Sequence, residues 1–104
     1  MSFERVAIIG LGLIGGSIGL AVAEHLPEVV TTGYDADPAV RRRAAERALT
    51  GKICETATEA VTDADLVILC VPVGAMGEVA REIAGALRSA TLVSDVGSSK
   101  RSIT

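Results

Sequence analysis

The apolar positions of the chain follow two patterns: short unbroken runs, and longer stretches in which apolar residues recur every three or four positions. The short runs occupy residues 6–9, 29–34, 66–71 and 91–96, and β-branched residues are frequent in them. Such runs are typical of strands that are buried on both faces of a sheet. A weaker run around Ile53 predicts one further short strand.

The stretches with helical spacing lie between these runs. Residues 13–26 have apolar side chains at three- and four-residue steps, and Pro27 ends the pattern. Residues 74–87 have the same spacing after Pro72, and residues 58–62 predict a shorter helix. Strands and helices therefore alternate along the chain.

A further helix is predicted to begin at Pro38 and to end near residue 49. Asp37 is a favourable N-cap, Pro38 suits the first helical position, and Gly51 is the expected C-terminal stop. The arginines of this helix fall largely outside its apolar face. The expected apolar face consists of Val40, Ala44, Ala48 and Leu49.

The alternation of strands and helices predicts a doubly wound α/β fold of the Rossmann type. Right-handed crossovers would make its sheet mainly parallel and place helices on both faces. The 104 residues suffice for one hydrophobic core, so a single domain is expected. Ligands of such folds bind beyond the carboxyl ends of the strands, where the strand order reverses.

Composition and charge exclude several classes of protein. Hydrophobic residues make up 49% of the chain and the net charge is only −3, which excludes a disordered chain. Nucleic acid is not an expected partner, because the chain has no excess of basic residues. Every apolar run is too short to span a membrane, and the first residues lack the pattern of a signal peptide. A cytoplasmic protein without membrane contact is expected.

Residues that bind metals or act as nucleophiles are few. Cys54 and Cys70 stand far from any metal-ligand spacing and are expected to be free buried thiols. His25, the only histidine, lies near the end of the first predicted helix, where its charge would favour the helix dipole. No metal site and no histidine-based catalytic triad are therefore expected.

A G-x-G-x-x-G segment begins at Gly10, between the first predicted strand and the first predicted helix. In this position Gly10 would permit a tight turn, Gly12 would let the backbone approach a pyrophosphate, and Gly15 would let the helix pack closely. Leu13 and Ile14 complete the expected cofactor contacts at the helix start. The alternative is a tight turn that holds no ligand.

Asp35 ends the second predicted strand about 20 residues after the glycines, where a carboxylate can accept hydrogen bonds from the adenosine ribose. It predicts NAD rather than NADP as the cofactor, because a 2′-phosphate would meet the charges of Asp35 and Asp37. The alternative is that the arginines at 41–43 bind this phosphate and favour NADP. A run of charged residues on a helix more often forms a solvent-exposed face than a phosphate site.

Two later segments also follow predicted strands. Val71, Pro72 and Val73 would form a stiff apolar lip against the cofactor, although Pro72 is equally suited to ending a strand. The segment after Asp95 places hydroxyl and amine groups, including that of Ser98, on a glycine turn at the expected nicotinamide end. The alternative for this turn is the cap of a helix.

Three segments together resemble the cofactor-binding half of prephenate and arogenate dehydrogenases. They are residues 10–17, 65–72 and 95–100, and the likeness spans nearly the whole chain. The resemblance implies an enzyme that oxidises and decarboxylates prephenate to 4-hydroxyphenylpyruvate, or arogenate to tyrosine, and passes hydride to a nicotinamide cofactor. It assigns the pyrophosphate to the three glycines, the ribose to Asp35, and the role of the active-site serine to Ser98.

In that family the catalytic histidine, the substrate-binding arginine and a helical dimerisation domain follow the serine turn, and residues 1–104 do not contain them. The chain is therefore expected to be the dinucleotide-binding domain alone. The resemblance implies that the full-length enzyme is a homodimer. By itself, the domain is expected to bind dinucleotide and to turn over little or no substrate.

Two other functions stay open at this point. One is a dehydrogenase of the β-hydroxyacid type. In that family a methionine would tend to stand at the position of Ile14, and Ser98 would have no assigned catalytic role. The other is a module that binds NAD and reports it through its conformation without catalysis.

Overall fold

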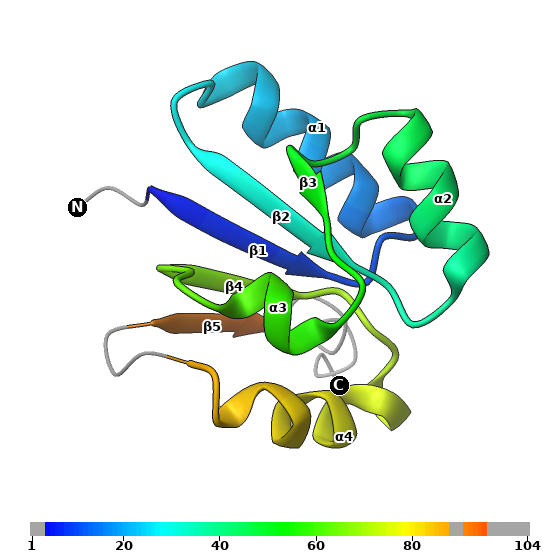
Figure 1. The fold of residues 1–104 in the computed structure, drawn as a ribbon, viewed down its shortest axis with the longest axis vertical. Coiled ribbons are helices and arrows are strands. Elements are labelled where there is room, and N and C mark those ends of the chain that lie inside the picture. The colour runs from blue at the N-terminus through cyan, green and yellow to red at the C-terminus, as the bar shows by residue number, and fades with distance from the viewer. Residues whose placement is uncertain (1–3, 88–90, 96–104) are drawn as a thin grey trace, which may run out of the picture.

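The computed structural model describes residues 4–87 and 91–95. It consists of five strands that alternate with four helices in this part of the chain (Figure 1). The strands are β1 (Arg5–Ile9), β2 (Val30–Tyr34), β3 (Lys52–Ile53), β4 (Leu66–Leu69) and β5 (Leu92–Asp95). The helices are α1 (Leu13–His25), α2 (Pro38–Glu46), α3 (Ala57–Val61) and α4 (Val73–Ala84).

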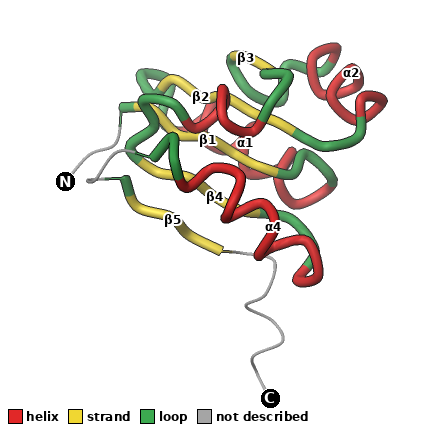
Figure 2. Tube along the Cα trace, turned by 60° about the horizontal axis from the view of Figure 1, so that its bottom comes forward, coloured by secondary structure: helices red, strands yellow, loops and turns green. Residues whose placement is uncertain are grey.

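The strands form one parallel sheet in the order β3-β2-β1-β4-β5. Figure 2 shows them side by side, with β3 and β5 at the two edges. The order reverses between β1 and β4, which is the switch point where ligands of such folds bind. The doubly wound architecture predicted from the alternating pattern is confirmed.

Helices cover both faces of the sheet, and the alternation of side chains along β1 serves both layers. Val6 and Ile8 face the layer that contains α1 and α2, whereas Ala7 and Ile9 face the layer that contains α3 and α4. All four side chains are at most 4% exposed. The central strand is therefore buried on both faces, which is why its sequence is an unbroken apolar run.

The end of the sheet opposite the switch point is fixed by a side chain. The Asp65 carboxylate, which directly precedes β4, accepts hydrogen bonds from the backbone N–H groups of Glu4 and Arg5, both at 2.9 Å. The Asp65 backbone N–H in turn donates to the Arg5 carbonyl at 2.8 Å. These three bonds join the beginnings of β1 and β4.

Helix α2 begins as predicted and ends earlier than predicted. The Asp37 side chain caps it by accepting from the Ala39 N–H at 2.9 Å, with Pro38 at the first helical position. The helix stops at Glu46, not near residue 49, and its end does not depend on Gly51.

The early end of α2 has a local cause. Ala48 takes the left-handed conformation with φ of +51°, and its N–H donates to the Ala45 carbonyl. The Leu49 N–H donates to the Ala44 carbonyl, which completes the Schellman pattern of a helix C-terminus. Ala48 is exposed, so its predicted place on the apolar face was wrong, whereas Ala44 is buried and Val40 and Leu49 pack beside it.

The two cysteines differ in their surroundings. Cys54 is buried in the layer under α3 and α4, and burial raises the pKa of its thiol, with the Glu59 carboxylate adding to the rise. Cys70 forms no disulfide and is only half-buried, so the prediction of two buried thiols outside disulfides is correct for Cys54 and too strong for Cys70.

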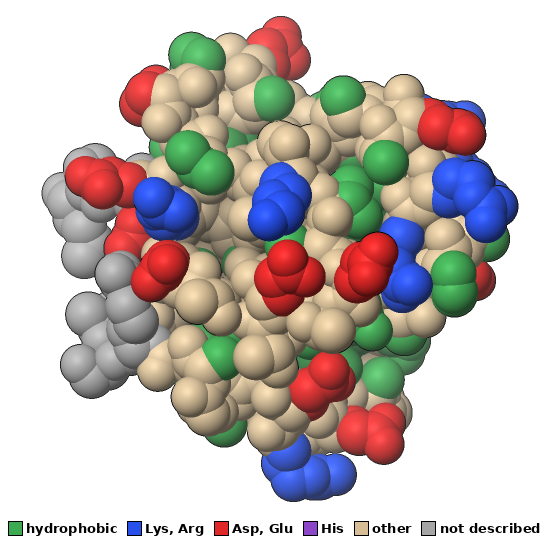
Figure 3. Space-filling model, in the orientation of Figure 1, with side chains coloured by type: hydrophobic (Ala, Val, Ile, Leu, Met, Phe, Trp, Pro, Cys, Tyr) green, Lys and Arg blue, Asp and Glu red, His purple; other side chains and the backbone are tan. Residues whose placement is uncertain are grey.

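Charged side chains of both signs occur on the surface of the described residues (Figure 3). Acidic and basic side chains are interspersed on the face shown in Figure 3. In the part of the chain that the structure describes, no helix has both the length and the apolar character that a membrane crossing requires.

Replacing Ala48 by glycine should raise the free energy of unfolding by about 0.5–1 kcal/mol, because glycine adopts the left-handed conformation without the clash of a Cβ. Ala45→Gly is the matched control, since Ala45 is exposed within α2 and its replacement should lower stability by about the same amount. Chemical denaturation of both variants tests this. Equal losses of stability would show that residue 48 is not left-handed.

Candidate functional site

The first glycine forms the turn between β1 and α1, at the switch point of the sheet. Gly10 has φ of +100°, and a Cβ at this position would lie only 2.5 Å from the Cys70 carbonyl oxygen at the end of β4. Its N–H donates to the Tyr34 carbonyl at the end of β2 at 2.7 Å. The turn is therefore held between the carboxyl ends of two neighbouring strands.

The other two glycines of the motif have different roles. A Cβ at Gly15 would collide with the Gly10 carbonyl oxygen. The third glycine therefore allows the first turn of α1 to pack against the glycine turn. A Cβ at Gly12 would meet no atom within 4 Å, so fold packing gives no reason for a glycine there. Open space above a backbone is what a closely approaching phosphate requires.

The beginning of α1 is suited to an anion. Gly12 is its N-cap and offers no side chain to bind the free N–H groups, and the first turn contains no acidic residue. The positive end of the helix dipole is therefore not neutralised by the helix itself. Leu13 and Ile14 are 88% and 55% exposed there, so both are accessible to a ligand, and their contact with a cofactor stays a prediction.

Asp35 joins the glycine turn to the turn that follows β2. One carboxylate oxygen accepts from the Leu11 N–H at 2.8 Å, and the other accepts from the Asp37 N–H at 2.9 Å. The side chain is half-buried. It is therefore fixed next to the glycine turn before any ligand arrives, and the Leu11 contact is a feature that the sequence analysis missed.

The arginines at 41–43 do not converge on one point. Arg41 donates from Nη1 to the Asp35 carbonyl at 2.8 Å and lies over the Tyr34 ring, 5.6 Å from its centroid. Arg43 instead lines a cleft between α1 and α2, and Arg42 is exposed. This arrangement does not support the alternative in which the three form a phosphate clamp.

A cavity of about 300 Å³ lies beside the glycine turn, between the ends of β2 and β4. Val71 and Pro72 line it, and their contact with a cofactor stays a prediction. The side chain of Val73 lies outside the described part of the structure. The cavity is mostly apolar and has Asp35 at its margin, a combination that suits a purine ring with a ribose attached. Its lining consists of Ile9, Gly10, Gly12, Tyr34, Asp35, Ala36, Cys70, Val71, Pro72, Ala75 and Val79.

The remaining predicted residues do not complete a catalytic site here. Strand β5 ends at Asp95 beside Leu69, at the same edge of the sheet, but Ser98 lies outside the described residues. His25 is exposed in the last turn of α1, at the helix end away from the glycine turn. Within residues 4–87 and 91–95, no group of three or more His, Cys, Asp or Glu side chains could hold a metal ion.

The sequence of this chain is similar to those of known proteins. The family model described as the prephenate dehydrogenase nucleotide-binding domain matches residues 18–104. Cyclohexadienyl dehydrogenase of Zymomonas mobilis is 45% identical over 101 residues, which are 97% of this chain and 34% of that protein. Prephenate dehydrogenase of Lactococcus lactis is 36% identical over 101 residues, covering 96% of this chain and 28% of that protein.

The fold of this chain is also similar to that of a solved prephenate dehydrogenase. Prephenate dehydrogenase from A. aeolicus, in complex with hydroxyphenyl propionate and NAD+, has a TM-score of 0.83 and 25% identity, with 94% of this chain and 35% of that chain covered. This chain spans about a third of the length of the curated relatives that it matches. The comparison therefore concerns their nucleotide-binding part.

Replacing Gly12 by valine should lower the affinity for NAD+ by at least about tenfold, because the side chain would occupy the open space above the turn. The fold should survive, since φ at this position is −75° and a Cβ meets nothing within 4 Å. Titration calorimetry and a thermal melt measure the two effects.

The control is Gly85→Val, because a Cβ at Gly85 also meets open space but lies at the end of α4. It should leave NAD+ affinity unchanged. Unchanged affinity in the Gly12 variant would contradict the interpretation of the glycine turn as a phosphate site.

Proposed function

Since the chain belongs to the family of the prephenate dehydrogenase nucleotide-binding domain, we propose that it binds NAD for the oxidative decarboxylation of prephenate or arogenate. The family match favours this function over a β-hydroxyacid dehydrogenase or a non-catalytic sensor. The observation that carries the proposal is the pairing of open space above Gly12 with a carboxylate fixed beside it by the Leu11 N–H.

The cofactor would lie across the switch point of the sheet. Its pyrophosphate would accept hydrogen bonds from the free N–H groups at the start of α1. The adenosine would enter the cavity of about 300 Å³, with Val71 and Pro72 against the base. Asp35 would accept from the ribose hydroxyls, and its negative charge would repel the 2′-phosphate of NADP.

The remainder of the reaction needs groups at the nicotinamide end. When bound, NAD supplies the acceptor for the hydride that leaves the substrate ring. The end of β5 at Asp95 directs the chain towards this edge of the sheet, and the family resemblance gives Ser98 the role of orienting the substrate. A base must also remove a proton from the ring hydroxyl. His25 is badly placed for this, at the far end of α1. The family resemblance assigns the base to a histidine outside residues 1–104.

Several broader features of the enzyme follow from the family resemblance. We propose that it acts in the cytoplasm, in the synthesis of tyrosine, and that residues 1–104 form its dinucleotide-binding domain. We also propose that a helical domain outside these residues supplies the substrate-binding arginine and the contacts of a homodimer. The choice between prephenate and arogenate would rest on that domain.

The test compares the present chain with a longer form that includes the following domain. Calorimetry should show that both bind NAD+. Formation of NADH should be fast only with the longer form, in the presence of prephenate or arogenate. Absence of NAD+ binding by both would overturn the proposal, as would a longer form that binds NAD+ but oxidises neither substrate.

Replacing Asp35 by asparagine should weaken NAD+ binding by about tenfold and narrow its advantage over NADP+, because a hydrogen bond to a charged acceptor contributes about 1.5–3 kcal/mol. Asp37→Asn is the control, since asparagine also caps helices well and the charge change is the same. The ratio of the two dissociation constants is the measured quantity. An equal loss of preference in both variants would show that Asp35 is not the selecting residue.

A further inference from the structure

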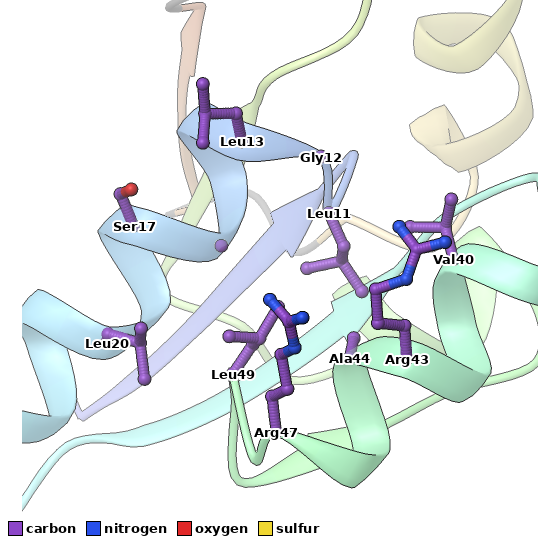
Figure 4. A pocket seen from close by; sticks show the side chains of 11 residues that line it. Leu11, Gly12, Leu13, Ser17, Leu20, Val40, Arg43, Ala44, Arg47 and Leu49 are labelled. Atoms are coloured by element: carbon purple, nitrogen blue, oxygen red, sulfur yellow. The ribbon is translucent and has the colours of Figure 1, made fainter.

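A second cavity lies between α1 and α2 (Figure 4). Its volume is about 420 Å³. It shares only Gly12 with the lining of the adenosine cavity. We call it the α1–α2 cleft, and its lining consists of Leu11, Gly12, Leu13, Gly16, Ser17, Leu20, Val40, Arg43, Ala44, Arg47 and Leu49.

The two sides of the α1–α2 cleft differ in chemistry. The floor and the α1 side are apolar apart from the Ser17 hydroxyl, and Leu11 and Leu49 lie between the helices. The α2 side contributes Arg43 and Arg47, which are one helical turn apart and therefore neighbours on the helix surface. Figure 4 shows the guanidinium groups of Arg43 on α2 and of Arg47, which directly follows α2, beside the apolar side chains.

Neither guanidinium has a partner among the residues that the structure describes. Arg43 and Arg47 make no ion pair and no side-chain hydrogen bond there, whereas Arg41 on the same helix is engaged with Asp35 and Tyr34. A guanidinium presents a planar fork of donors that matches the oxygens of a carboxylate or phosphate. Two unpaired forks beside an apolar cavity are complementary to an anion with an apolar body.

We propose that the α1–α2 cleft binds a small organic oxyanion, with a carboxylate or phosphate group held by Arg43 and Arg47. The apolar body of the ligand lies against Leu11, Leu20 and Leu49. Burial of that body supplies affinity, and the two guanidinium groups supply the selection for negative charge. This site shares only Gly12 with the adenosine cavity, and binding there does not depend on the dehydrogenase reaction.

The experiment uses hexanoate and phenyl phosphate as probes, so that the two head groups are compared. Each is titrated into the isotope-labelled chain with saturating NAD+ present, and backbone amide shifts are recorded by NMR. Saturable shifts are expected at Gly16, Leu20 and Leu49, with smaller ones at Ala36 and Ala75 in the adenosine cavity. Acetate, inorganic phosphate and 1-hexanol should each bind at least about tenfold more weakly, because each lacks the charge or the apolar body.

Paired variants separate the two arginines from net charge. Arg43→Gln with Arg47→Gln should weaken both probes by about tenfold or more. Arg42→Gln with Arg81→Gln removes the same charge from exposed positions that do not line the cleft, and should change affinity by less than about twofold. Leu20→Glu adds a carboxylate to the exposed apolar side of the cleft and should also abolish binding. This variant tests the site independently if the double arginine variant does not fold.

Three results would overturn the proposal: equal losses in the two arginine pairs, probe shifts confined to the adenosine cavity, or a titration that does not saturate. A preference for one head group identifies the anion as carboxylate or phosphate, and either result supports the site. NAD+ binding is measured in parallel. If the unmodified chain binds the probes but does not bind NAD+, the proposed function is contradicted and this inference stands.

Discussion

The structure depends on the close approach of the glycine turn to the ends of β2 and β4. Gly10 lies so near the Cys70 carbonyl that no side chain fits between them, and its N–H is bonded to the Tyr34 carbonyl. The Leu11 N–H is bonded to the Asp35 carboxylate in the same place. Because these contacts link three neighbouring strands, the position of α1 relative to the switch point is fixed by the fold and not by a ligand.

Asp35 consequently serves both the fold and the proposed cofactor site. Two backbone N–H groups hold its carboxylate, which leaves the remaining lone pairs for the ribose hydroxyls. A group that is already fixed loses little conformational entropy when a ligand binds. The same bonds explain why the residue can be recognised from sequence: it must directly follow β2 and lie within reach of the turn after β1.

The sequence was sufficient for the features that depend on local patterns. Unbroken apolar runs predicted the parallel strands, and the spacing of Gly10, Gly12 and Gly15 predicted the turn that the structure contains. The end of α2 could not be predicted in the same way, because Ala48 adopts a left-handed conformation that glycine or asparagine usually occupies.

The directions of the arginines also required the structure. Successive residues on a helix point about 100° apart, so a run of arginines in sequence does not form a cluster in space. Arg41 therefore reaches Asp35 while Arg43 lines the α1–α2 cleft. Which neighbour each side chain meets depends on how α2 is rotated against α1, and this is a property of packing that no local pattern encodes.

Asp65 lies at the end of the sheet opposite the glycine turn, yet it affects the geometry of the nucleotide site. By joining the beginnings of β1 and β4, its carboxylate opposes sliding of the two strands past each other. A slip of two residues would keep every side chain on its original face but carry Gly10 about 6.6 Å along the strand, away from Cys70. A carboxylate at the beginnings of β1 and β4 thus helps to keep Gly10 aligned with Cys70 at the other end of these strands.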